Sequence, residues 1–218
     1  MDFALVWNYL PYLLRAGLVT IEISVVSLVF GSLIGLGLTF ARISSYRSLQ
    51  VLVWLYVWLI RGTPLLLQIF VIYYWLPGYG VILPAFVAGV TALSLNAAAY
   101  YVDIFRAAIL AVPTGQVEAG HAIGMRPWQI MRKIVIPLSI RPALPPYIGQ
   151  SINLVKNSSL VSVISVQELM YTSQSIYSST YKVAEILGTA GLIYLLINTV
   201  LQALQTWLEK RLSYYTVR

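Results

Sequence analysis

Four charged side chains lie inside long apolar stretches of the sequence: Glu22, Arg61, Asp103 and Lys156. If these stretches cross a membrane, a charge near the bilayer centre costs ~2.5–3.5 kcal/mol to insert. Arg61 lies about ten residues into its stretch, at a depth of ~15 Å for a helical rise of 1.5 Å per residue. Charges at this depth need a partner, which is either another side chain of the protein or a polar ligand.

Polar residues accompany these charges at helical spacing. Asn96, Tyr100 and Asp103 fall at positions i, i+4 and i+7 and therefore share one helix face. Two more polar stripes have similar spacing: Asn153, Lys156 and Asn157, and the weaker set Thr20, Ser24 and Ser27. Polar faces on several apolar helices predict a shared polar cavity.

Two explanations of the charged residues are open. Arg61 could pair with Asp103, or Asp103 with Arg106 one turn away, and such pairs would need no ligand. Alternatively, Glu22 and Asp103 hold a cationic group of a zwitterionic ligand, and Arg61 or Lys156 holds its carboxylate. For the whole set we favour the ligand, and the predicted binding residues are Glu22, Ser24, Arg61, Asn96, Tyr100, Asp103, Asn153 and Lys156.

The composition indicates a membrane protein. The 218 residues are 59% hydrophobic and only 10% charged, with a mean hydropathy of +0.80. Without cysteine and with a single histidine, His121, the chain offers no metal site. The net charge of +7 does not indicate nucleic acid, because the basic residues gather at the ends of apolar segments, as topology signals do.

The hydropathy pattern predicts an all-α membrane protein of about five transmembrane helices, with residues 1–218 as a single transmembrane domain. The spans are expected at about 18–41, 51–76, 82–112, 141–157 and 183–208. Residues 1–14 form an amphipathic interfacial segment, and 158–182 a short helix and loop. In the first span, Gly31-x3-Gly35 allows close helix packing.

Basic residues predict the orientation. One side would carry ten of them and the other only Arg15 and Lys182. Because basic residues stay cytoplasmic, the N-terminus is expected outside and the C-terminus inside. The cytoplasmic set is Arg42, Arg47, Arg106, Arg126, Arg132, Lys133, Arg141, Lys210, Arg211 and Arg218.

The longest stretch that cannot lie in lipid runs from Val112 to Pro137. Pro113 and Gly115 interrupt the preceding span, and residues 116–123 can form a short helix. Gly124 then supplies a C-terminal stop and Pro127 the start of a second helix. The stretch is therefore expected to be a helical hairpin outside the membrane.

This hairpin resembles a known family signature. Glu118-Ala119-Gly120, Gly124 and Ile134-Val135-Ile136-Pro137 resemble the EAA loop of ABC-importer permeases, with Gly120 and Ile136 in place of an alanine and a leucine. Segments resembling the polar-amino-acid branch of that family are Arg61-Gly62-Thr63-Pro64-Leu65-Leu66, Pro145-Pro146 and Lys156-Asn157-Ser158-Ser159-Leu160.

The resemblance implies a type I ABC-importer permease fold in the bacterial cytoplasmic (inner) membrane. It implies that the loop docks on an ATP-hydrolysing subunit through Glu118, Ala119, Gly124, Arg126 and Pro137. The partners would be two ATPase subunits, a second identical or similar permease copy, an external solute-binding protein, membrane lipid and an amino-acid substrate. Glu22 and Asp103 favour a basic amino acid such as arginine, lysine or histidine.

The chain itself is not expected to be an enzyme or to hold a cofactor. It lacks the G-x4-G-K-[ST] motif with which a P-loop binds ATP. The alternative function is a self-sufficient channel or secondary transporter that uses Glu22 and Asp103 as ion sites. Five spans give no inverted repeat, which argues against that alternative.

Overall fold

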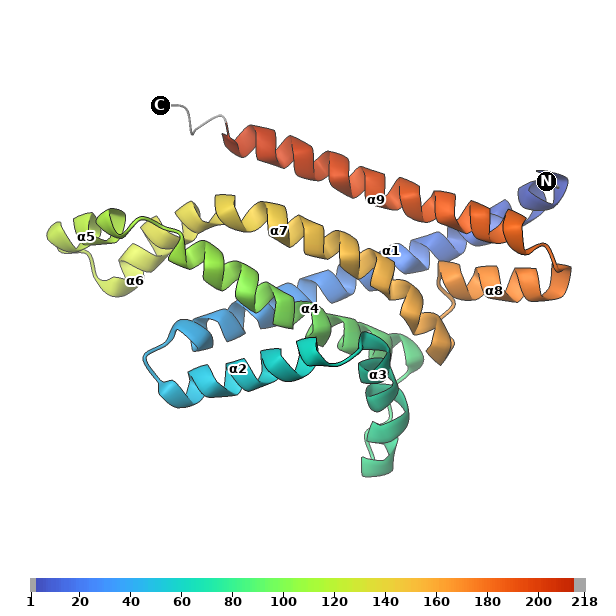
Figure 1. The fold of residues 1–218 in the computed structure, drawn as a ribbon, viewed down its shortest axis with the longest axis horizontal. Coiled ribbons are helices and arrows are strands. Elements are labelled where there is room, and N and C mark those ends of the chain that lie inside the picture. Colours follow the sequence, from blue (N-terminus) through green and yellow to red (C-terminus); the bar gives the residue numbers. More distant parts are fainter. Residues whose placement is uncertain (1–2, 214–218) are drawn as a thin grey trace.

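A computed structural model describes residues 3–213 of the chain (Figure 1). The described residues form helices and connecting turns, and no strand occurs among them. The helical elements are α1 (Phe3–Ile43), α2 (Arg47–Gly62), α3 (Leu65–Phe70), η1 (Val71–Trp75), η2 (Leu76–Tyr79), α4 (Ala85–Leu110), α5 (Thr114–Ala122), α6 (Pro127–Ile130), η3 (Met131–Val135), α7 (Ile136–Asn157), η4 (Ser158–Ile164), α8 (Leu169–Thr180) and α9 (Val183–Ser213).

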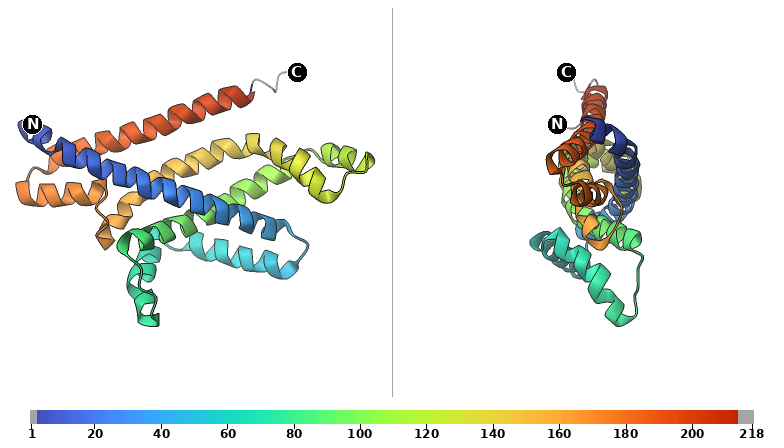
Figure 2. Two further views of the ribbon diagram at one scale, coloured as in Figure 1. Left: turned by 180° about the vertical axis from the view of Figure 1, so that it is seen from behind. Right: turned by 90° about the vertical axis from the view of Figure 1, so that its right-hand side faces the viewer.

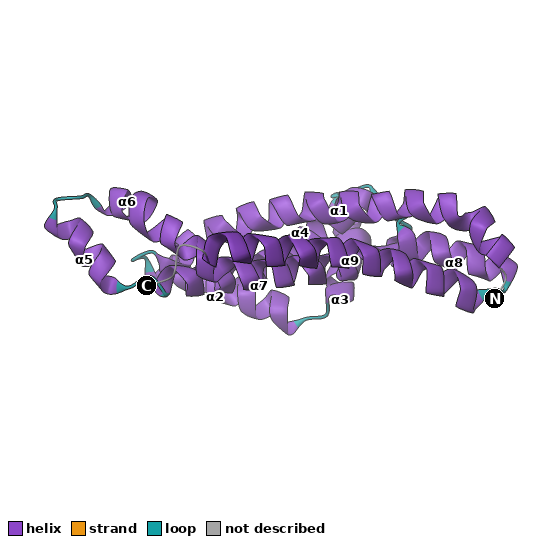
Figure 3. Ribbon diagram, turned by 90° about the horizontal axis from the view of Figure 1, so that it is seen from above, coloured by secondary structure: helices purple, strands orange, loops and turns teal. Residues whose placement is uncertain are grey.

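The long helices α1, α4, α7 and α9 run roughly along one axis of an elongated bundle (Figures 1 and 2). The α5–α6 hairpin lies at one end of this axis, and the N-terminal part of α1 lies at the other end with α8. The segment from α3 to η2 projects sideways from the bundle. The view from above shows the same separation of the hairpin from α8 (Figure 3).

Close packing of α1 on α4 forms the centre of the bundle. A Cβ added to Gly31 would lie 3.1 Å from the Cβ of Ala97, and one added to Gly35 would lie 2.7 Å from the Cβ of Tyr101. Only hydrogen on these two glycines lets the helices approach so closely. The packing role predicted for Gly31-x3-Gly35 is therefore confirmed.

The structure changes two of the predicted spans. Residues 3–14 of the predicted interfacial segment and the first span are one continuous helix, α1, in which Leu13 is buried against α8 and α9. The second span is broken, and its two parts, Arg47–Gly62 and Leu65–Tyr79, meet at 106°. The break follows from Pro64, which lacks an N–H donor and forces Thr63 into the extended region (φ −119°, ψ 147°).

Three helices within residues 3–213 are long and apolar enough to cross a membrane, and the bent pair could supply a fourth span. They lie in Ala4–Ile43, Ala85–Leu110 and Val183–Arg211. α7, which contains Pro142, Pro145 and Pro146, is not among them. The number of five spans and their orientation therefore remain predictions.

Other local predictions agree with the structure. The stretch 158–182 forms η4 and α8, a short helix with flanking turns. The last long helix, α9, extends to Ser213 and thus beyond the predicted end of its span near residue 208. Arg218 of the predicted cytoplasmic set lies outside the described residues.

Candidate functional site

Arg61 and Asp103 form an ion pair between α2 and α4. The Arg61 guanidinium also lies 4.9 Å from the centre of the Tyr100 ring, within the range of a cation–π contact. The two charged side chains keep 44% and 48% of their surface exposed. The structure thus brings together three predicted site residues, and it shows the direct pairing that the sequence analysis left open.

Asn96, one turn before Tyr100 on α4, forms part of a hydrogen-bonded bridge. Its side-chain amide donates to Gln68 Oε1 at 3.0 Å, and Gln68 Nε2 donates to the carbonyl oxygens of Ile60 at 2.7 Å and Thr63 at 3.1 Å. Asn96 is buried, and the bridge fixes the bend between α2 and α3 against α4. Sequence reasoning missed Gln68, although its position just after the RGTPLL motif was a usable signal.

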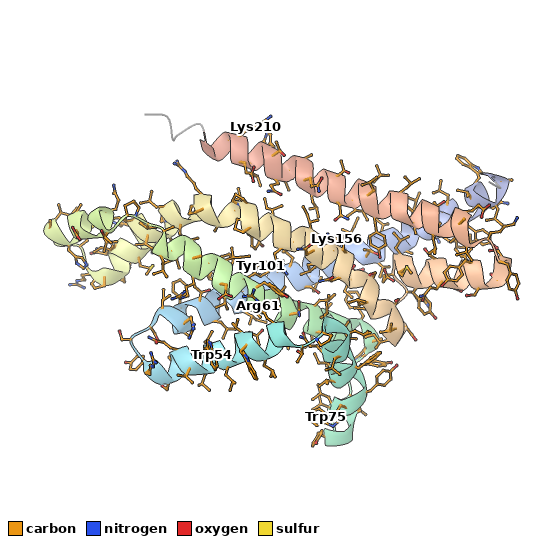
Figure 4. All side chains as sticks on the ribbon, viewed as in Figure 1. Trp54, Arg61, Trp75, Tyr101, Lys156 and Lys210 are labelled. Carbon is orange, nitrogen blue, oxygen red and sulfur yellow. The ribbon has the colours of Figure 1, made fainter. Side chains whose placement is uncertain are left out.

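The remaining predicted site residues lie apart from the ion pair. Lys156 and Asn153 are exposed on α7, and α4 lies between α7 and α2 in Figure 4, where Arg61 and Lys156 are labelled. Ser24 is buried and donates to the carbonyl of Thr20 at 2.6 Å. Glu22 is exposed on α1, and within residues 3–213 no ion pair or hydrogen bond joins it to Arg61 or Asp103.

Glu168 is a buried acid that the sequence analysis missed. It is the only acidic residue in 158–182 and is fully buried at the start of α8. Its carboxylate accepts hydrogen bonds from the Tyr171 N–H at 2.7 Å, the Tyr194 hydroxyl at 2.8 Å and the Thr20 hydroxyl at 3.4 Å. Burial raises the pKa of Glu168 above its ordinary value, against the lowering effect of these donors. The residue therefore ties α1, α8 and α9 together.

The α5–α6 hairpin has the predicted form and a small core of its own. Val112, Ile130 and Val135 are buried within it. A Cβ added to Gly120 would lie 3.0 Å from side-chain atoms of both Ile130 and Ile134, so the alanine of the signature would fit only if these side chains shifted.

The connection between the two helices of the hairpin also follows the sequence. Gly124 has a φ of +75°, a conformation that favours glycine, and it ends α5 as predicted. Pro127 begins α6, and the Arg126 N–H donates to Gln129 Oε1 at 2.8 Å.

The hairpin leaves its signature residues accessible. Glu118, Ala119, Gly124, Arg126 and Pro137 are all exposed. Glu118 and Ala119 belong to α5, in the hairpin at the end of the bundle (Figure 1), whereas Pro137 is the second residue of α7. Ile123 and Trp128 are exposed as well, so the surface of the hairpin is partly polar and partly apolar.

This fold defines a membrane-embedded subunit that presents an exposed helical hairpin and carries no P-loop motif. The chain belongs to the family described as binding-protein-dependent transport system inner membrane component, which matches residues 27–214. It is a permease of an amino-acid ABC importer of the inner membrane, and separate subunits hydrolyse ATP. The self-sufficient channel or secondary transporter is thereby set aside.

Three curated relatives match this chain over most of their length. The chain is 36% identical to an octopine transport system permease protein of Rhizobium radiobacter, over 95% of the chain and 89% of that protein. It is 34% identical to an arginine transport system permease protein of Bacillus subtilis (98% of both). It is also 34% identical to a glutamine transport system permease protein of Escherichia coli, over 97% of the chain and 98% of that protein.

Solved structures agree with this assignment. The fold matches a crystal structure of an amino acid ABC transporter with histidines, with a TM-score of 0.90, 34% identity and coverage of 97% of this chain and 99% of that one. An inward-facing methionine ABC transporter matches with a TM-score of 0.78 at 21% identity, over 94% and 97% of the two chains, and shares the fold.

Proposed function

We propose that this permease imports a polar amino acid with a cationic side chain along the surface that contains Arg61, Tyr100 and Asp103. The observation that carries the proposal is the half-exposed ion pair between Arg61 and Asp103. Against lipid, an exposed pair deep in the bilayer would be costly. The cost is lower if the pair faces a polar path between this chain and a second permease copy.

The ion pair gives the path a way to recognise a zwitterion. A substrate cation competes with Arg61 for the Asp103 carboxylate, and the released guanidinium then binds the substrate carboxylate. Lys156 and Asn153, exposed on α7, offer a second contact for that carboxylate or for polar groups. Glu22 on α1 adds negative charge if the second copy brings it to the path.

The hairpin supplies the coupling to ATP. In the assembly that we propose, two ATPase subunits hold the α5–α6 hairpins of two permease chains, and an external binding protein delivers substrate at the opposite end. ATP binding moves the hairpins and turns the long helices between inward- and outward-facing arrangements. Glu118, Ala119, Gly124, Arg126 and Pro137 would form the contact.

The substrates named for the relatives support a polar amino acid without selecting one. Arginine, octopine and glutamine permeases match with 34–36% identity. The preference for a cationic side chain therefore rests on the acids of this chain.

Uptake of arginine and of glutamine into vesicles containing the assembled transporter tests the proposal. Asp103→Asn and Glu22→Gln should weaken arginine uptake by about 1–3 kcal/mol, the contribution of a charge-assisted hydrogen bond, and glutamine uptake by less. Glu209→Gln removes the same charge near the end of α9 and serves as the control. Equal losses for both substrates would show that the two acids have a structural role, and would refute the preference for a basic amino acid.

A further inference from the structure

A pair of adjoining clefts lies between α1, α2 and α4. The C-terminal ends of α1 and α4, which line the wider cleft, lie on the side of the bundle nearer the α5–α6 hairpin (Figure 1). The wider cleft has a volume of about 660 Å³ and the narrower one about 440 Å³. Arg42 and Trp54 line both of them. Arg61 and Asp103 line the narrower cleft. The wider cleft is lined by Arg106 and Leu110, closer to the end of α4.

The wider cleft is strongly basic. Arg42 of α1, Arg47 of α2 and Arg106 of α4 line it, and none of its lining residues is acidic. Arginine stays protonated at any physiological pH, so the three guanidiniums repel one another unless an anion lies between them. In the narrower cleft, by contrast, Asp103 already neutralises Arg61. The positive charge of the wider cleft therefore favours binding of an anionic ligand there.

Hydrogen bonds hold this site in shape. Arg42 Nη1 donates to the carbonyl oxygen of Gln50 at 2.6 Å, and Gln50 Nε2 donates to the carbonyl oxygen of Ser44 at 2.7 Å. Together they fix the short connection between α1 and α2. Arg47 is the first residue of α2, where the helix dipole adds positive potential.

The position and the walls of the cleft favour an amphiphilic anion. Arg42 precedes the last residue of α1, and Arg106 lies one turn before the end of α4, so the guanidiniums lie where spanning helices leave the bilayer. Apart from the three arginines and Gln50, the wall is apolar, with Val51, Trp54 and Leu110 each 49–61% exposed. Tryptophan beside arginine at a helix end is typical of contact with lipid headgroups.

We infer that the wider cleft binds the phosphate of an anionic phospholipid from the leaflet on the hairpin side. The phosphate lies among Arg42, Arg47 and Arg106, and the acyl chains follow the exposed apolar side of α2 past Val51 and Leu55. A soluble phosphate would satisfy the guanidiniums but leave these apolar walls uncovered. The inference does not depend on which amino acid is transported.

Fluorescence quenching by brominated lipids tests the inference in the assembled transporter. Brominated phosphatidylglycerol is titrated against brominated phosphatidylcholine, and the signal of Trp54 is obtained by subtracting that of a Trp54→Phe transporter. Phosphatidylglycerol should quench Trp54 at the lower lipid fraction. Arg47→Gln and Arg106→Gln should each weaken this binding about fivefold, the effect of one basic residue at an anionic surface.

Two variants make the test specific. Arg47→Lys keeps the charge and should keep most of the binding, which separates loss of charge from misfolding. Arg15→Gln removes one arginine from the far end of α1 and should change nothing. Equal quenching by both lipids, or no effect of Arg47→Gln and Arg106→Gln, would overturn the inference.

The other possible occupants are distinguished by the same measurement. If inorganic phosphate abolishes the preference for phosphatidylglycerol, the cleft binds a soluble anion instead of a lipid. If neither lipid quenches Trp54 in the assembled transporter, a protein chain covers the cleft. Either result would refute a lipid site.

Discussion

Glu168 joins residues that are far apart in the sequence. Its carboxylate bonds with Thr20, 148 residues before it, and with Tyr194, 26 residues after it. No basic side chain supplies these bonds, so the acid is held by hydroxyl and backbone N–H donors alone. Such an acid is costly to ionise in the folded protein, which explains the direction in which its pKa moves.

This raised pKa predicts a pH-dependent stability. Because the folded state holds the Glu168 proton more tightly than the unfolded chain, the contribution of Glu168 is complete below its ordinary pKa of 4.5. It is lost as the pH rises through the raised pKa. Glu168→Gln should remove this part of the pH dependence of the melting temperature in detergent, and Glu209→Gln should leave it unchanged. An unaltered slope in Glu168→Gln would contradict the assignment.

A second substitution at this position isolates the hydrogen bonds. Glu168→Leu leaves the Tyr194 hydroxyl and the Tyr171 N–H without their acceptor. The variant should lose about 1–3 kcal/mol of stability at every pH, the cost of unsatisfied buried donors. Chemical denaturation of the purified protein measures this loss.

At the scale of elements, α1 and α4 depend on glycine for their contact. Gly35 faces Tyr101 with no room for a Cβ, whereas Gly37 has nothing within 4 Å. Gly35→Val should therefore destabilise the protein by about 1–3 kcal/mol through overpacking. Gly37→Val is the matched control in the same helix, and comparable losses in both variants would show that helix propensity and not packing decides the effect.

The α5–α6 hairpin allows a separate test of coupling. Glu118→Lys and Gly124→Asp should leave the protein inserted but reduce the amount transported per ATP hydrolysed at least about fivefold, the lower range of coupling energies between sites. Gln116→Lys introduces the same charge on an exposed position of α5 and should have little effect. Normal transport by the Glu118 and Gly124 variants would rule out the hairpin as the coupling element.

At the scale of the whole molecule, the shape separates two ends. The hairpin and the α1–α2 connection lie toward one end of the bundle, and α8 lies at the other (Figures 1 and 2). The basic residues Arg42, Arg47, Arg126 and Arg132 belong to the hairpin end. This distribution favours a cytoplasmic hairpin.

Cysteine labelling tests the orientation directly, because the chain has no cysteine of its own. A reagent that cannot cross the membrane should label single cysteines at Tyr79 or Ser178 in intact cells. Cysteines at Ser45 or Gln129 should stay unlabelled until the cells are opened. Labelling of Gln129 from outside would invert the proposed topology.

The sequence by itself determined the features that depend on neighbouring residues. Apolar runs indicated a membrane protein, and Gly124 and Pro127 predicted where the hairpin helices end and begin. The close packing of α1 against another helix could also be inferred, because Gly31 and Gly35 lie one turn apart on the same helix face. These signals are local, so the rest of the fold is not needed to interpret them.

Only the tertiary structure decided which distant side chains meet. Arg61 pairs with Asp103 across 42 residues, and Asn96 bonds with Gln68 across 28, so these predicted site residues have partners within the chain. The path of α2 into α3 and the burial of Glu168 depend likewise on what packs beside them. A polar residue on an apolar helix has the same sequence signal whether it faces a cavity or a neighbouring helix, and the packing of the helices makes that choice.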